Sequence, residues 1–64
     1  MPRYKLFALD DVGRVDRGFD LSFPDDTAAI AHARHIPDAA RVEVMRNNTI
    51  IACVLLANGT AKVI

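Results

Sequence analysis

The chain has 64 residues, of which 52% are hydrophobic and 25% are charged, and its formal net charge at pH 7 is zero. This length predicts one domain over residues 1–64, and the balanced charge excludes a global basic field that would attract nucleic acid or an anionic membrane. Cys53 is the only cysteine, so no disulfide can form within the chain, and a domain this small is expected to gain stability by association.

The N-terminal segment predicts a strand from Arg3 to Leu9 that ends in a turn. Side chains alternate along a strand. One face would carry Tyr4, Leu6 and Ala8, and the other would carry Lys5, Phe7 and Leu9. A tight turn is expected over residues 10–13, because Gly13 adopts the left-handed conformation at no steric cost.

The second predicted strand shows the clearest alternation in the chain. Its apolar face carries Val15, Phe19, Leu21 and Phe23, with Arg17 among them. Its polar face, which we expect to meet water, carries Asp16, Gly18, Asp20 and Ser22. Gly18 is a candidate β-bulge position, because a glycine inside a strand often marks one.

A short helix is expected between Pro24 and Pro37. Asp25 and Asp26 suit its start, because a carboxylate there accepts hydrogen bonds from free backbone N–H groups. Its apolar stripe is narrow and consists of Ala29, Ile30, Ala33 and Ile36. About 11 residues make a helix about 16 Å long, which is too short to cover four or five strands spanning about 19–24 Å.

The C-terminal half predicts further strands separated by tight turns. They are, in order, a strand over Arg41–Arg46, a turn at Asn47-Asn48, a strand over Thr49–Leu56, a turn at Asn58-Gly59 and an optional short strand over Thr60–Ile64. The expected fold is therefore α+β: an antiparallel sheet of four to five strands in the order β-β-α-β-β, with one helix on one face.

The run Thr49–Leu56 is apolar on both of its faces. One face would carry Ile50, Ala52, Val54 and Leu56, and the other would carry Ile51, Cys53 and Leu55. Such a strand needs cover on both sides, and we expect one short helix to supply only one of them.

The sequence does not indicate a biological role. We expect a non-enzymatic interaction module that forms a homodimer, with an interface at Ile51, Cys53, Leu55, Phe7 and Leu9. Three alternatives are open: association through an edge strand, an unidentified protein partner, and a strongly coiled or closed sheet that needs no partner. Which face meets the helix is also open.

No catalytic, cofactor-binding or metal site is predicted. His32 and His35 are spaced to reach one metal ion, but a site needs a third ligand. The two aspartate pairs have structural explanations in a turn and a helix cap, and Ser22 stands in no triad context. Cys53 belongs to an apolar strand, whereas a nucleophilic thiol needs an electropositive, partly exposed setting.

A nucleic-acid-binding or regulatory protein is the alternative function. Its candidate residues are Arg3, Lys5, Arg41 and Arg46, which could share one region of the sheet, with Tyr4 or Phe7 offering a stacking surface. The absence of a basic excess argues against this alternative.

The chain is expected to be cytoplasmic. Its N-terminus shows no signal peptide, because only four apolar residues follow Lys5 before Asp10. No apolar run approaches the roughly 20 residues of a membrane span.

The sequence also resembles a known group of proteins. The resemblance rests on the opening Met-Pro-Arg-Tyr, on Asp25-Asp26 before an alanine-rich helix, and on Val42-Glu43-Val44 before a turn and an apolar strand. In these features the chain is similar to short uncharacterised alphaproteobacterial proteins and to a broader bacterial domain of unknown function. Met45 stands where those proteins often have tryptophan. The resemblance implies a small cytoplasmic β-β-α-β-β protein and transfers no activity or site residue.

Overall fold

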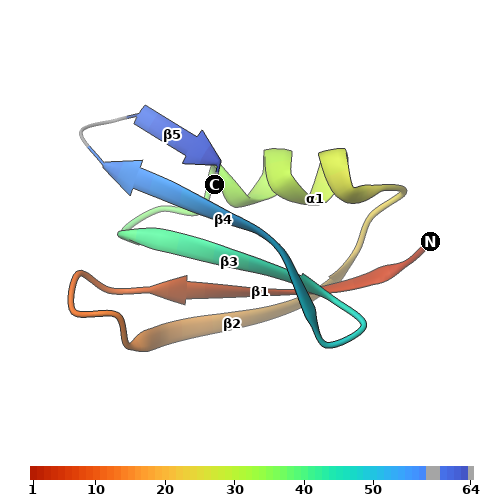
Figure 1. The fold of residues 1–64 in the computed structure, drawn as a ribbon, viewed down its shortest axis with the longest axis horizontal. Coiled ribbons are helices and arrows are strands. Elements are labelled where there is room, and N and C mark those ends of the chain that lie inside the picture. The colour runs from red at the N-terminus through yellow and green to blue at the C-terminus, as the bar shows by residue number, and fades with distance from the viewer. Residues whose placement is uncertain (58–59, 64) are drawn as a thin grey trace.

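The protein forms one antiparallel sheet of five strands with a helix packed on one side (Figure 1). The computed structural model describes residues 1–57 and 60–63, and side-chain surroundings for residues 1–56 and 63. The elements are β1 (Arg3–Leu9), β2 (Val15–Ser22), α1 (Asp26–Ala33), β3 (Arg41–Arg46), β4 (Thr49–Ala57) and β5 (Thr60–Val63). The strand order is β2-β1-β3-β4-β5, which confirms the predicted α+β fold and the optional terminal strand.

Two of the predicted turns are built as their residue types require. Gly13 has a φ of 85°, and the Asp10 carboxylate accepts hydrogen bonds from the backbone N–H groups of Val12 and Arg14, at 3.1 and 2.8 Å. Asn47 and Asn48 have φ values of 52° and 63°, as a two-residue hairpin turn between β3 and β4 needs. The predicted Asn58-Gly59 turn lies outside the described residues.

The helix begins where the sequence predicts and ends earlier. Asp25 is the N-cap, and its Oδ1 accepts a hydrogen bond from the N–H of Ala28 at 2.8 Å. The helix stops at Ala33 because the next turn tightens: the N–H of His35 bonds to the carbonyl of His32 at 3.0 Å, three residues back. It therefore has eight residues where about 11 were expected.

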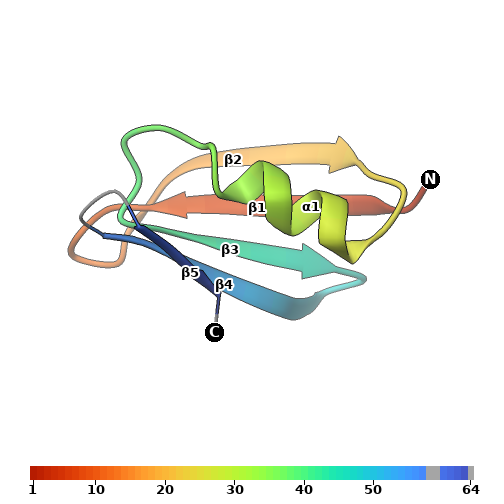
Figure 2. The same cartoon turned by 90° about the horizontal axis from the view of Figure 1, so that it is seen from above.

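The hydrophobic core lies between α1 and the sheet. It consists of Tyr4, Leu6, Ala8, Ala29, Ala33, Ile36, Val42, Val44, Ala52 and Val54. The helix contributes mainly alanines, so its backbone lies close to the sheet, where it packs mainly against β3 and β4 and lies above the middle of the sheet (Figure 2). The sheet curls at its β5 end toward the helix (Figure 1), and Val63 helps line a hollow beside α1.

Two β-bulges shift the register of the sheet, and neither is at Gly18. In β2 the bulge is at Asp16, because Arg17 pairs with Ala8 and Val15 pairs with Leu9. In β4 the bulge is at Ile51, because Ala52 pairs with Val44 while Ile50 pairs with Met45. The proposed bulge at Gly18 is wrong: Gly18 pairs in register with Phe7.

The two glycines predict opposite effects on stability. Gly13→Ala should lower the free energy of unfolding by about 1 kcal/mol, because a side chain disfavours a positive φ. Gly18→Ala should be neutral or raise it by up to about 1 kcal/mol, because alanine fits a strand better than glycine does. An added Cβ at Gly18 would meet the Phe7 ring at 3.6 Å, an ordinary contact. Urea unfolding measures both, and a destabilised Gly18→Ala would contradict this account.

Candidate functional site

The side of the sheet that faces away from α1 is covered by no helix or strand among the described residues, although the β1–β2 turn adjoins it beside Arg41 and Leu55, and we call it the open face. Residues that pair directly across antiparallel strands share a face. The register therefore places the following side chains together on the open face: Lys5, Phe7 and Leu9 from β1, Arg41, Glu43 and Met45 from β3, and Ile50, Cys53 and Leu55 from β4.

Most apolar side chains of the open face are only partly buried. Phe7, Met45, Cys53 and Leu55 are half-buried, and Ile50 is 55% exposed. Leu9 is 4% exposed, although it lies outside the core cluster beneath α1. A contiguous patch of apolar groups at this level of exposure is typical of a surface that another molecule covers.

Four of the five residues predicted as an interface lie together on the open face: Phe7, Leu9, Cys53 and Leu55. Ile51 does not, because the bulge in β4 turns it toward the core, where it packs against the buried cluster. Ile50 takes its place beside Met45 on the open face. No signal in the sequence could have located this bulge, because either isoleucine satisfies either face.

Charged side chains of both signs interrupt the apolar patch. Glu43 is half-buried between Phe7 and Cys53, and no described Lys or Arg side chain forms an ion pair with it. Arg41 lies two residues away on the same strand and reaches toward the β1–β2 turn, where its Nη2 would be 3.7 Å from a Cβ at Gly13. The Nε of Arg41 is buried, and no described atom accepts a hydrogen bond from it.

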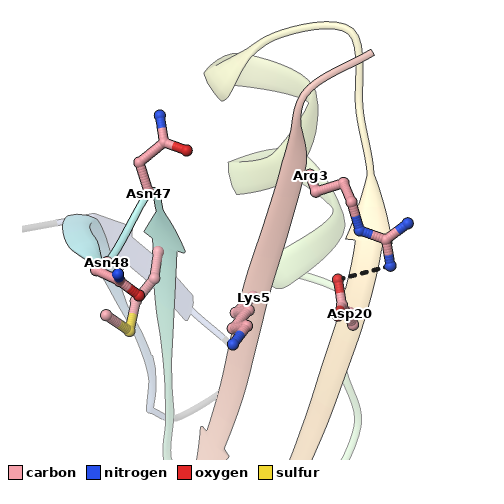
Figure 3. A pocket seen from close by; sticks show the side chains of 6 residues that line it. Arg3, Lys5, Asp20, Asn47 and Asn48 are labelled. Carbon is pink, nitrogen blue, oxygen red and sulfur yellow. Dashed lines mark ion pairs between the residues drawn. The ribbon is translucent and has the colours of Figure 1, made fainter.

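One end of the open face forms a hollow of about 320 Å³, lined by Arg3, Lys5, Asp20, Met45, Asn47 and Asn48 (Figure 3). Arg3 extends from β1 toward β2, where its guanidinium forms an ion pair with Asp20 at 3.0 Å. This pairing compensates the charge of Arg3, so the hollow offers an anion little beyond the ammonium group of Lys5.

The four basic residues of the nucleic-acid alternative do not share one region. Arg3 and Lys5 lie at one end of the open face, whereas Arg41 lies beside Leu9, about 13 Å from Lys5 at the usual rise per residue. Arg46 belongs to the helix side, where its Nη1 contacts the Asp26 carboxylate at 3.0 Å.

A polar cluster that sequence reasoning missed ties α1 to the sheet. The hydroxyl of Tyr4, whose side chain is fully buried, donates a hydrogen bond to Oδ1 of Asp26 at 2.6 Å, and Arg46 binds the same oxygen. The hydrogen bond to Asp26 and then burial raise the pKa of Tyr4 above its ordinary value. Asp25 therefore caps the helix, whereas Asp26 holds its first turn against the sheet.

The other candidate side chains do not assemble a metal site within the described part of the chain. No group of three or more His, Cys, Asp or Glu side chains that could hold a metal occurs among the described residues. His32 instead lies against Phe23, with ring centroids 5.3 Å apart. Ser22 is exposed at the end of β2. In the described part of the chain, no helix is long and apolar enough to cross a membrane.

Comparisons with protein-family models, with curated proteins and with solved structures found no match. The resemblance to short bacterial proteins that open with Met-Pro-Arg-Tyr therefore stays a prediction, and the open face is interpreted from its own geometry.

The Tyr4–Asp26 contact predicts a loss of stability at alkaline pH. Because the pKa of Tyr4 is raised in the folded state, the unfolded chain releases this proton first. The contribution of protonated Tyr4 to the free energy of unfolding is complete below about pH 10, the ordinary tyrosine pKa, and is lost as the pH rises through the pKa of the folded state. Tyr4→Phe should lack this part of the pH dependence in urea unfolding.

Tyr4 is the only tyrosine and the chain has no tryptophan, so tyrosinate absorbance reports this one group. The folded protein should titrate at a higher pH than the urea-unfolded protein. Equal midpoints in the two states would contradict the predicted shift.

Proposed function

We propose that the chain is a non-enzymatic interaction module that forms a homodimer by stacking the open faces of two copies. The observation that carries the proposal is the partly exposed apolar patch across the central strands, centred on Phe7, Cys53 and Leu55. Packing two such faces about 10 Å apart would bury both patches in one step.

The size of the face supports association between two copies. A standard interface buries about 800 Å² per partner, which is roughly a fifth of the 4210 Å² that the chain exposes. Standard interfaces range from about 600 to about 1,000 Å² per partner. The molecule measures 31 × 20 × 18 Å, so one broad face can supply an area near the lower end of this range. For a domain this small, the apolar area removed from water adds to a limited core.

The sheet edges support association less well than the face does. The β2 edge carries Asp16 and Asp20 and is interrupted by a bulge, and the β5 edge is four residues long. Charges, bulges and short strands are the features by which proteins protect an edge from pairing with another chain. The separation of the four basic residues likewise gives nucleic-acid binding no specific support.

Leu55→Asp should weaken the homodimer by at least about tenfold, because it replaces an apolar side chain of the patch with a carboxylate that must lose water on association. Sedimentation equilibrium of the wild type and the variant at micromolar concentrations measures the effect. Thr27→Asp is the matched control: Thr27 is exposed on α1, on the opposite side of the sheet, so this carboxylate should leave the dimer unchanged.

Circular dichroism and thermal unfolding establish that both variants keep the fold. A wild type that is monomeric throughout this concentration range would refute the proposal. A folded Leu55→Asp variant with unchanged association would place the interface elsewhere.

A further inference from the structure

We infer that the two copies are related by a two-fold axis that runs across β3 between Glu43 and Arg41, so that each Glu43 pairs with the partner's Arg41. This inference rests on the proposed function, because it specifies the contact between the two open faces. It assigns a role to two charged side chains that an apolar interface alone leaves unexplained.

The open face is arranged in three rows that run across the strands. On β1, β3 and β4, the Lys5 row contains Lys5, Met45 and Ile50; the Glu43 row contains Phe7, Glu43 and Cys53; and the Arg41 row contains Leu9, Arg41 and Leu55. On β2 these rows continue with Asp20, Gly18 and Val15, respectively. Adjacent rows are about 7 Å apart, because two residues of an antiparallel strand span that distance. Glu43 and Arg41 therefore occupy the middle of neighbouring rows, each with an apolar residue on both sides.

An axis across the strands, midway between the Glu43 and Arg41 rows, exchanges these two rows between copies. Glu43 then faces the partner's Arg41, and Arg41 faces the partner's Glu43. The flanking position on β4 matches as well, because Cys53 faces the partner's Leu55, and both side chains are partly exposed. A symmetric interface makes each of these contacts twice.

Other simple placements bring like charges together or leave charges unpaired. An axis along β3 sets Glu43 against the partner's Glu43 and Arg41 against the partner's Arg41. An axis across the strands through the Glu43 row sets Glu43 against the partner's Glu43, and one through the Arg41 row sets Arg41 against the partner's Arg41. An axis between the Lys5 and Glu43 rows places Glu43 against the partner's Met45. Like charges that face each other oppose association, and a buried charge needs a partner.

The state of the two side chains in one copy supports this pairing. Glu43 is half-buried, with no ion pair to a described Lys or Arg side chain, and the buried Nε of Arg41 has no described acceptor. Both groups have thus lost part of their hydration within the monomer. A guanidinium offers five donors to a carboxylate, so the reciprocal pairs would give Glu43 an ion-pair partner and set the register of the two sheets.

Charge reversal tests the pairing without altering the apolar patch. Glu43→Arg alone sets two arginines against each other at both contacts, and Arg41→Glu alone sets two glutamates against each other. Each variant should therefore lose at least about tenfold in self-association. An equimolar mixture of the two should form a heterodimer, because both contacts then join opposite charges, and the double variant should associate like the wild type.

Native mass spectrometry resolves these species, because the two variants differ in mass, and sedimentation equilibrium gives their affinities. Arg34→Glu is the control, since Arg34 is exposed on the helix side and its reversal should leave the wild-type dimer intact. Circular dichroism checks each fold. If a reversal unfolds the chain, Glu43→Gln and Arg41→Gln replace it in a double-mutant cycle, in which additive effects on affinity would overturn the pairing.

The outcomes separate this inference from the proposed function. A monomeric wild type refutes both. A dimeric wild type whose reversed variants still self-associate, or fail to form the heterodimer when mixed, keeps the homodimer and overturns the Glu43–Arg41 pairing.

Discussion

Leu6 pairs with Val44 and Ala8 pairs with Val42 where β1 lies against β3, and this register decides which side of the sheet receives the helix. The same register places Phe7 beside Glu43 on the other side. Because side chains alternate with a period of two, a slip by one residue would exchange the two faces of a strand. The core and the open face are thus two results of one pairing, and neither can change without the other.

The helix completes the core through small residues. Ala29 and Ala33 are fully buried and let the α1 backbone approach the sheet, while the contact of Asp26 with Tyr4 and Arg46 holds the first turn in place. Curling of the sheet brings β5 toward α1 and improves the cover of this side. The coiled sheet that we considered as an alternative therefore explains how the apolar side chains on the helix side are covered. It does not explain how those of the open face are covered.

Much of the fold could be predicted because its signals are local. Alternation located the strands, Gly13 and the Asn47-Asn48 pair located turns, and Asp25 located the start of the helix. The bulge at Ile51 could not be predicted, because two adjacent isoleucines satisfy either register. The anchoring role of Asp26 depends on Tyr4, which is 22 residues away in the sequence, and no local pattern encodes that distance.

Most residues of the open face could be predicted from the sequence, but their arrangement relative to one another could not. Phe7, Leu9, Cys53 and Leu55 followed from strand alternation, and the structure brings them together. The arrangement of Glu43 and Arg41 became meaningful only when the pairing of β1, β3 and β4 defined rows across the sheet. Arg46 illustrates the converse: its charge suggested a basic surface, but its position in β3 directs it to the helix side and to Asp26.

The bulge at Ile51 also separates two parts of the β3–β4 hairpin. On the turn side, Arg46 pairs with Thr49 and Met45 with Ile50; beyond the bulge, Val44 pairs with Ala52. One extra residue thus absorbs the difference between the register that the turn imposes and the register that the core requires. Because the bulge takes up this one residue, the hairpin combines a tight two-residue turn with a strand whose Ala52 and Val54 face the helix.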